Sequence, residues 1–155
     1  MRDLYQRYGP ALRRKCERML GNQQDAEDVV QTIFIDLMAR RPAEVTLGYL
    51  YQAATTRCLN RIRDHRRRRA LLDQHGQATL VVGSADLGER LVTLDLLTRL
   101  VDRLEGPLAD VFVYLFLDQL TQAEVATLTG TSRKTVGHRL ARIRAVMAEL
   151  LETTP

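Results

Sequence analysis

The stretch LTQAEVATLTGTSRKTVGHRLARIRAVM, residues 120–147, holds two short helical patterns separated by a glycine. A period near 3.6 places Val125 and Leu128 on one face of a first helix, and the same period predicts a second helix after Gly130. Ser132 is a good N-cap for the second helix, because its hydroxyl can accept a hydrogen bond from an otherwise unpaired amide. Two helices joined by a tight turn with glycine form a helix-turn-helix, whose second helix can lie in the major groove of DNA.

The second helix of this pair is strongly basic. No acidic residue occurs between Glu124 and Glu149. An ordinary solvated helical hairpin is the alternative, but such a hairpin usually mixes its charges, so a run that excludes acids favours a nucleic-acid-binding surface. The basic residues of this run are Arg133, Lys134, His138, Arg139, Arg142 and Arg144.

The whole chain has 155 residues, 45% of them hydrophobic, and a formal net charge of +4. This composition allows one ordinary domain or two small ones with packed cores. The charge is unevenly spread, because residues 61–69, RIRDHRRRR, are basic, whereas residues 72–119 are mainly acidic. Only Lys15 and Lys134 are lysines, and the planar guanidinium of arginine suits phosphates and base edges, although a GC-rich genome would produce the same bias.

Several classes of protein are disfavoured. No apolar run is long enough to span a membrane, and the N-terminus lacks the apolar core of a signal peptide, so we expect a cytoplasmic protein without membrane insertion. Cys16 and Cys58 lack the neighbouring ligands of a metal site and are expected to be buried thiols, with no metal or cofactor. No carboxylate pair or nucleophile motif surrounds His65, His75 or His138, so an enzyme is not expected.

Apolar spacing predicts three helices in the first half of the chain. The first has an apolar face from Leu4 to Leu20 and ends at Gly21, and the second has an apolar stripe from Val29 to Met38. A third helix starts at about Leu47 and runs into the arginine cluster.

The segment DQHGQATLVVGSAD, residues 73–86, has two glycines and no helical period, which indicates a linker. The helical period returns at Leu87, and TLVV is too short to build a sheet. We therefore predict an all-α chain of two small helical domains, residues 1–70 and 87–155, joined by a flexible linker at residues 71–86. The second domain contains the helix-turn-helix.

The blocks LGNQQDAEDVVQTIFIDLM (residues 20–38) and GYLYQAATTRCLNRIRDHRRRR (residues 48–69), followed by the helix-turn-helix, resemble bacterial sigma factors of the extracytoplasmic-function (ECF) class over nearly the full chain. The resemblance implies a transcription initiation factor that binds core RNA polymerase, directs it to certain promoters and helps to open the DNA. It also implies an anti-sigma factor as a partner. The first domain would bind polymerase through Asp25, Asp28, Gln31 and Asp36.

The resemblance also implies two DNA-binding surfaces. The third helix would read the minus-ten element, because trapping a strand requires a basic track for phosphates and a pocket for an unstacked base. Its candidate residues are Arg57, Asn60, Arg61, Arg63, Arg66 and Arg67. The helix-turn-helix would read the minus-thirty-five element, with Arg142 and His138 facing the groove and Arg133, Lys134 and Arg139 completing the DNA-binding set.

The chain departs from the family pattern at a few positions. Thr56 and Asn60 replace a common Asn and Asp in the minus-ten region, and Met38 replaces a common Trp. Gly137 stands where relatives often have a basic residue, so either the helix lies unusually close to DNA there or one base contact is lost. Two alternatives remain open: a one-component helix-turn-helix regulator, and a sigma-like decoy that binds polymerase or anti-sigma factor without initiating transcription.

Overall fold

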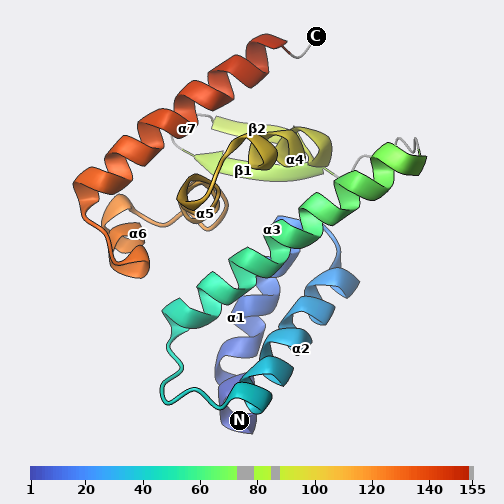
Figure 1. The fold of residues 1–155 in the computed structure, drawn as a ribbon, viewed down its shortest axis with the longest axis vertical. Coiled ribbons are helices and arrows are strands. Elements are labelled where there is room, and N and C mark those ends of the chain that lie inside the picture. Colours follow the sequence, from blue (N-terminus) through green and yellow to red (C-terminus); the bar gives the residue numbers. More distant parts are fainter. Residues whose placement is uncertain (73–78, 85–87, 154–155) are drawn as a thin grey trace. The chain divides into compact units, whose positions relative to one another are not determined.

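The structure, a computed structural model, describes the backbone of residues 1–72, 79–84 and 88–153 and the side chains of residues 1–68 and 96–153. The chain divides into two compact units, Met1–His65 and Arg66–Pro155, and each is described by itself. Along the chain the elements are α1 (Arg2–Leu20), α2 (Gln23–Arg40), α3 (Leu47–Leu72), β1 (Thr79–Ser84), β2 (Gly88–Thr93), α4 (Leu94–Arg103), α5 (Pro107–Phe112), the π-helical turn η1 (Val113–Leu117), α6 (Gln122–Thr129) and α7 (Arg133–Thr153) (Figure 1). The prediction of a helical fold is confirmed.

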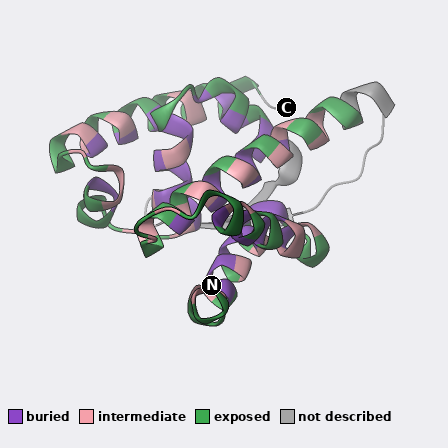
Figure 2. Ribbon diagram, turned by 60° about the horizontal axis from the view of Figure 1, so that its bottom comes forward, coloured by how far each residue is buried: buried purple, intermediate pink, exposed green. Residues whose placement is uncertain are grey.

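The first unit is built from the apolar faces of α1, α2 and the N-terminal part of α3. Each helix has buried residues at the predicted spacing of three or four, so one face points inward and the other toward solvent (Figure 2). The fully or almost fully buried apolar side chains are Leu12, Cys16, Met19, Ala26, Val30, Ile33, Leu37, Leu50, Ala54, Cys58, Leu59 and Ile62.

Gly21 ends α1 as the sequence predicts, and a local side-chain hydrogen bond starts α2. Gly21 has a φ of 65°, the left-handed conformation that closes α1, and its amide donates to the carbonyl of Glu17. The side-chain oxygen of Asn22 accepts a hydrogen bond from the Asp25 amide at 3.0 Å, which caps α2. The two helices are thereby joined by a very short turn and pack against each other.

Met38 is an exception to the predicted apolar stripe of α2. Met38 is 51% exposed and Ile35 is 57% exposed, whereas Leu37, which lies between them in the sequence, is buried. Met38 lies four residues after the buried Phe34, so helical spacing assigns it to the inward face, but it stands in the last turn of α2, which ends at Arg40, where its side chain is exposed. The prediction that it packs inward is therefore wrong.

A polar hub ties α1 to α2. The carboxylate of Glu27 accepts hydrogen bonds from Arg13 Nε at 2.5 Å and from the Tyr5 hydroxyl at 3.3 Å. The ring of Tyr5 packs edge-on against Phe34, with ring centroids 5.0 Å apart. The Arg13 guanidinium, through this hydrogen bond, holds the pKa of the Glu27 carboxyl below its usual range.

The second unit differs from the sequence prediction near its start. Where a helical period was expected from Leu87, residues Gly88–Thr93 form β2, and helix α4 begins only at Leu94. β2 pairs antiparallel with β1, with Leu80 opposite Val92. β1 lies inside the predicted linker, of which residues 73–78 and 85–86 fall outside the described part. The apolar and β-branched residues of TLVV and RLVT are typical of strands. The sequence analysis missed the hairpin because a strand forms only with a partner segment, and the search for a helical period does not identify that partner.

The rest of the second unit is helical and has its own core. The inward faces of α4, α5 and η1 carry long apolar side chains, and Phe112 stacks on Phe116 with ring centroids 5.2 Å apart. Helix α7 packs against both α5 and α6. The buried apolar side chains among the described residues of this unit are Leu97, Leu100, Val101, Leu104, Leu108, Ala109, Val111, Phe112, Val113, Tyr114, Phe116, Leu117, Val125, Ala126, Val136, Leu140, Ile143 and Leu150.

We predict that Glu27→Gln lowers the free energy of unfolding at pH 7 by about 0.5–1 kcal/mol, since the pair with Arg13 is partly exposed. The folded-state pKa of Glu27 is depressed, so its stabilisation is present above the unfolded pKa, about 4.3, and is lost as the pH falls through the folded pKa. Urea unfolding of both proteins at pH 7 and pH 3 measures the difference.

Glu44→Gln is the matched control, because Glu44 is exposed and makes no ion pair among the described residues. It should change stability little at either pH. A Glu27→Gln deficit as large at pH 3 as at pH 7 would show that the ionised carboxylate is not the source.

Candidate nucleic-acid interface

The turn between α6 and α7 is fixed by short local interactions. The Thr121 hydroxyl caps α6 by accepting from the Glu124 amide at 3.1 Å. Gly130 ends α6 with a φ of 67°, and the Ser132 hydroxyl accepts from the Thr135 amide at 3.1 Å at the start of α7. The predicted glycine break and Ser132 cap are confirmed, and α6 and α7 form the helix-turn-helix.

Helix α7 separates an apolar face from a basic one. Val136, Leu140 and Ile143 are buried against the rest of the unit. Lys134 and His138 are exposed and lie four residues apart, and Arg142 continues the same row at the next step of four. Of the other predicted DNA-binding residues in α7, Arg133 is exposed and Arg139 is half-buried. The helix therefore presents a row of basic side chains on its solvent side, which can contact phosphates and base edges.

Gly137 lies beside the start of α6. A Cβ atom added at this position would lie 3.7 Å from Oε1 of Gln122, an ordinary van der Waals distance. No backbone constraint requires glycine here, since the residue is inside a regular helix and does not have a positive φ. The missing side chain thus leaves room next to Gln122.

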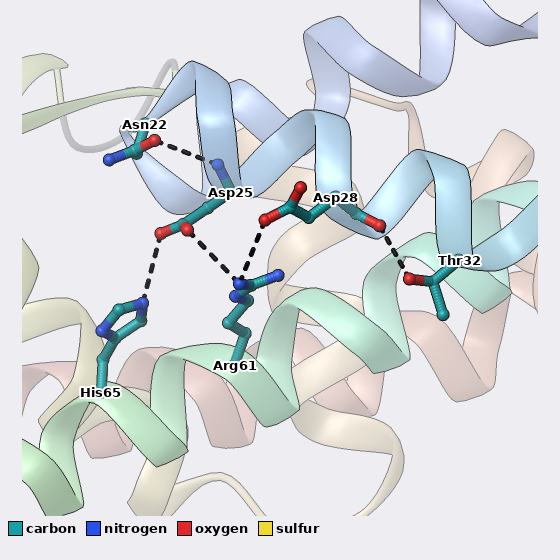
Figure 3. Close-up of polar contacts among 6 residues, drawn as sticks. All are labelled: Asn22, Asp25, Asp28, Thr32, Arg61 and His65. Atoms are coloured by element: carbon teal, nitrogen blue, oxygen red, sulfur yellow. Dashed lines mark hydrogen bonds and ion pairs between the residues drawn. The ribbon is translucent and has the colours of Figure 1, made fainter.

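In the first unit, predicted polymerase-binding carboxylates pair with predicted DNA-binding arginines. Arg61 Nη2 lies 3.4 Å from Asp25 Oδ1 and 3.6 Å from Asp28 Oδ2 (Figure 3). Nε2 of His65 lies 3.3 Å from the other oxygen of Asp25. The Thr32 hydroxyl donates at 2.8 Å to the backbone carbonyl of Asp28. This hydrogen bond does not involve the Asp28 carboxylate, which can therefore contact Arg61.

A second contact of the same kind lies farther along the two helices, where Arg57 of α3 pairs with Asp36 of α2. Residues 57, 61 and 65 follow one another at steps of four, so they form one row on α3 that faces α2. We call the six residues of these contacts the α2–α3 ion-pair ladder; they are Asp25, Asp28 and Asp36 of α2 and Arg57, Arg61 and His65 of α3.

The other predicted residues lie outside the ladder. Gln31 donates to Glu27 at 3.5 Å and is exposed. Asn60 and Arg67 are exposed and Arg63 is half-buried, and none of the three makes an ion pair or side-chain hydrogen bond among the residues with described side chains. Arg66, within the second unit, pairs with Asp102. The predicted basic track of α3 therefore contains both paired and unpaired cations.

Three features were not found from the sequence. For the ladder the sequence does carry a signal, because acids at positions 25 and 28 and basic residues at 57, 61 and 65 repeat at helical steps. The signal becomes readable only when it is known that α2 lies against α3. The Glu27 hub gives no comparable signal. The third feature is Lys15, which is fully buried with its ammonium 5.0 Å from the centre of the Tyr51 ring, whereas Tyr49 is 40% exposed.

The two cysteines are both fully buried, as predicted. A hydrogen bond with Cys16, together with burial, raises the pKa of the Cys58 thiol far above its ordinary value, which makes it a poor nucleophile. In the described part of the chain, no group of three or more His, Cys, Asp or Glu residues is arranged to hold a metal ion. No helix in that part is long and apolar enough to cross a bilayer.

Comparison with known proteins gives two family matches. The model of sigma-70 region 2 matches residues 4–68, and the model of sigma-70 region 4 matches residues 94–147, which together make up more than half of the chain. No curated protein matches it. The fold is similar to a chain in the co-crystal structure of the sigma factor RpoE in complex with the anti-sigma factor NepR from Bartonella quintana, with 18% identity, full coverage of both chains and a TM-score of 0.53.

We predict that Gly137→Ala stabilises the protein by about 1 kcal/mol, because alanine costs less conformational entropy in a helix and its methyl group fits beside Gln122. Thermal unfolding should show a rise in Tm of about 4–8 °C if the second unit melts as a small domain. Affinity for promoter DNA should not change. Loss of DNA affinity with the stability gain would instead mean that the helix backbone approaches DNA at this position.

Proposed function

Because the chain belongs to the sigma-70 family of transcription initiation factors, we propose that it acts in the cytoplasm as an ECF-class sigma factor that binds core RNA polymerase and selects promoters. The observation that carries this proposal is the row of exposed cations on the solvent side of α7, within the part of the chain that matches region 4. It acts by binding rather than by catalysis. A further proposed partner is an anti-sigma factor, because the similar structure is a sigma factor in complex with an anti-sigma factor.

In the proposed minus-thirty-five contact, α7 enters the major groove. Arg142 and His138 reach base edges, while Arg133 and Lys134, at the start of the helix, contact phosphates together with Arg139. The first turn of a helix also favours anions, because its unpaired amides and the helix dipole are positive there. Lys134 and Arg133 strengthen that attraction to the backbone.

In the proposed minus-ten contact, α3 follows a single strand. Arg63 and Arg67 supply cations for phosphates, and Asn60 can hydrogen-bond to a base or sugar. Tyr49, near the start of α3, has an exposed ring that can stack on an unpaired base. Tyr51 is a poorer platform, since the Lys15 ammonium lies over its ring.

The proposed polymerase surface is the polar side of α2. Asp28, whose side chain is 46% exposed, and the exposed Gln31 stand there at a three-residue step, which puts them side by side. A carboxylate and an amide so placed can form charge-assisted hydrogen bonds with a basic partner. Asp25 and Asp36 belong to the same surface and are partly engaged by α3.

Reconstituted transcription tests the proposal directly. Core polymerase with the purified chain should produce run-off transcripts from a subset of a promoter library, and core alone should not. Tight promoter binding by the free chain without any transcript would favour a one-component regulator. Binding to core without transcripts from any promoter would favour a sigma-like decoy.

We predict different defects for two α7 variants in the reconstituted holoenzyme. Arg142→Ala should weaken binding to the cognate minus-thirty-five sequence by about 1–3 kcal/mol and relax the preference at one base pair. Lys134→Ala should weaken binding to all sequences alike and reduce the salt slope by about one. Filter-binding titrations over a range of salt concentrations on cognate and single-substituted sites measure both effects.

Arg14→Ala is the matched control, because it removes one exposed positive charge from α1. It should leave both the base preference and the salt slope unchanged. An Arg142→Ala variant that kept its full base preference would refute the placement of Arg142 in the groove.

A further inference from the structure

The α2–α3 ion-pair ladder joins the two proposed binding surfaces of the first unit at the level of single atoms. Arg61, a DNA-binding candidate from the sequence, lies within 3.6 Å of Asp28, proposed for polymerase. Arg57 and Asp36 repeat this relation. A guanidinium nitrogen that donates to a carboxylate is not available to a phosphate, and that carboxylate is not available to a basic group of a partner. Both binding events therefore compete with the same internal contacts.

The two carboxylates around Arg61 are not equivalent. The Asp25 side chain is 21% exposed and also contacts His65, whereas that of Asp28 is 46% exposed and, among the residues with described side chains, forms an ion pair with Arg61 only. The backbone at Asp25 is further held by the Asn22 cap. An outside partner can therefore bind the Asp28 carboxylate and break its contact with Arg61, while the contact between Asp25 and His65 still joins the two helices.

We propose that the ladder couples polymerase docking to DNA binding. A basic group of the polymerase that takes Asp28 removes one of the two carboxylates that hold Arg61, and the guanidinium becomes more available to the DNA backbone. By linkage, a phosphate that takes Arg61 makes Asp28 more available to polymerase, by the same factor. This coupling rests on the proposed function, because it requires that the polar side of α2 binds polymerase and that α3 follows DNA, with Arg61 as a further phosphate contact.

The expected size of the effect follows from exposure. Arg61 is 34% exposed, so water and salt screen its pairs, and such pairs shift an equilibrium by about fivefold at most. The contacts are thus weak enough to be exchanged for an external partner. Loss of Asp28 leaves the contact with Asp25, and we expect a change of about twofold to fivefold.

Asp28→Asn in the full-length chain, without polymerase, tests the DNA side. The probe is a fluorescein-labelled single-stranded DNA of random sequence at one low salt concentration, measured by anisotropy. Asp64→Asn is the matched control, because Asp64 is exposed on α3 and makes no ion pair among the described residues. Asp28→Asn should bind the DNA about twofold to fivefold more tightly than Asp64→Asn, and this advantage should vanish when both carry Arg61→Gln.

The polymerase side is tested by titration with core enzyme. Arg61→Gln should bind core about twofold to fivefold more tightly than the unchanged chain, and Asp28→Asn should bind it more weakly. Arg14→Gln, which removes a positive charge from α1, should have no effect on this affinity. Circular dichroism verifies that every variant keeps its helical content.

The outcomes separate the coupling from the function on which it rests. If the unchanged chain binds core and DNA but Asp28→Asn and Asp64→Asn gain the same DNA affinity, net charge explains the gain and the coupling is wrong. An advantage of Asp28→Asn that persists with Arg61→Gln contradicts it as well. If the unchanged chain binds neither core nor DNA, the proposed function itself fails.

Discussion

The pairing of acidic residues on α2 with basic residues on α3 is the interaction on which the surface chemistry of the first unit depends. Between Arg57 and Arg69, α3 carries many cations and only Asp64 as an acid, so its neighbouring charges repel one another. The carboxylates of Asp25, Asp28 and Asp36 offset part of that repulsion from the adjacent helix. The apolar core beneath them sets the register of the two helices, and this register brings the charges into contact.

The basic surface of α7 has no acidic counterpart within its own sequence. No acid occurs between Glu124 and Glu149, and the helix is held instead by the buried side chains of Val136 and Ile143 and by the Ser132 cap. The basic side chains of α7 therefore have no acid within the same stretch of sequence to pair with. The two proposed DNA surfaces thus differ in kind: acids of the neighbouring helix pair with the first, whereas the second has no acid in its own stretch of sequence.

Local signals in the sequence were sufficient to predict most helices. Gly21, Gly130 and Ser132 act within a few residues of where they stand, and the spacing of residues such as Ile33 and Leu37 identifies the buried face. Features that depend on distant partners were not predictable in this way.

The antiparallel pairing of Leu80 with Val92 and the contact of Arg57 with Asp36 each join segments that no short window contains. Met38 was misplaced because helical spacing from the buried Phe34 assigns it to the apolar stripe, although it lies in the last turn of α2 and is exposed. For the candidate site, the sequence indicated which charges gather on each helix, but not that acids and bases assigned to different partners would contact one another.

The degree of exposure of the ladder suits it to exchange rather than to permanent stabilisation. A fully buried ion pair costs about 3–5 kcal/mol to break by removing one partner, because the remaining charge stays buried, so a binding partner would have to supply that energy. A pair exposed to water costs about 1 kcal/mol or less, because water can solvate whichever charge is released. Asp28 and Arg61 are 46% and 34% exposed, which puts them in the second regime. Their contact can order α2 and α3 in the free protein and still give way to a phosphate or a basic side chain.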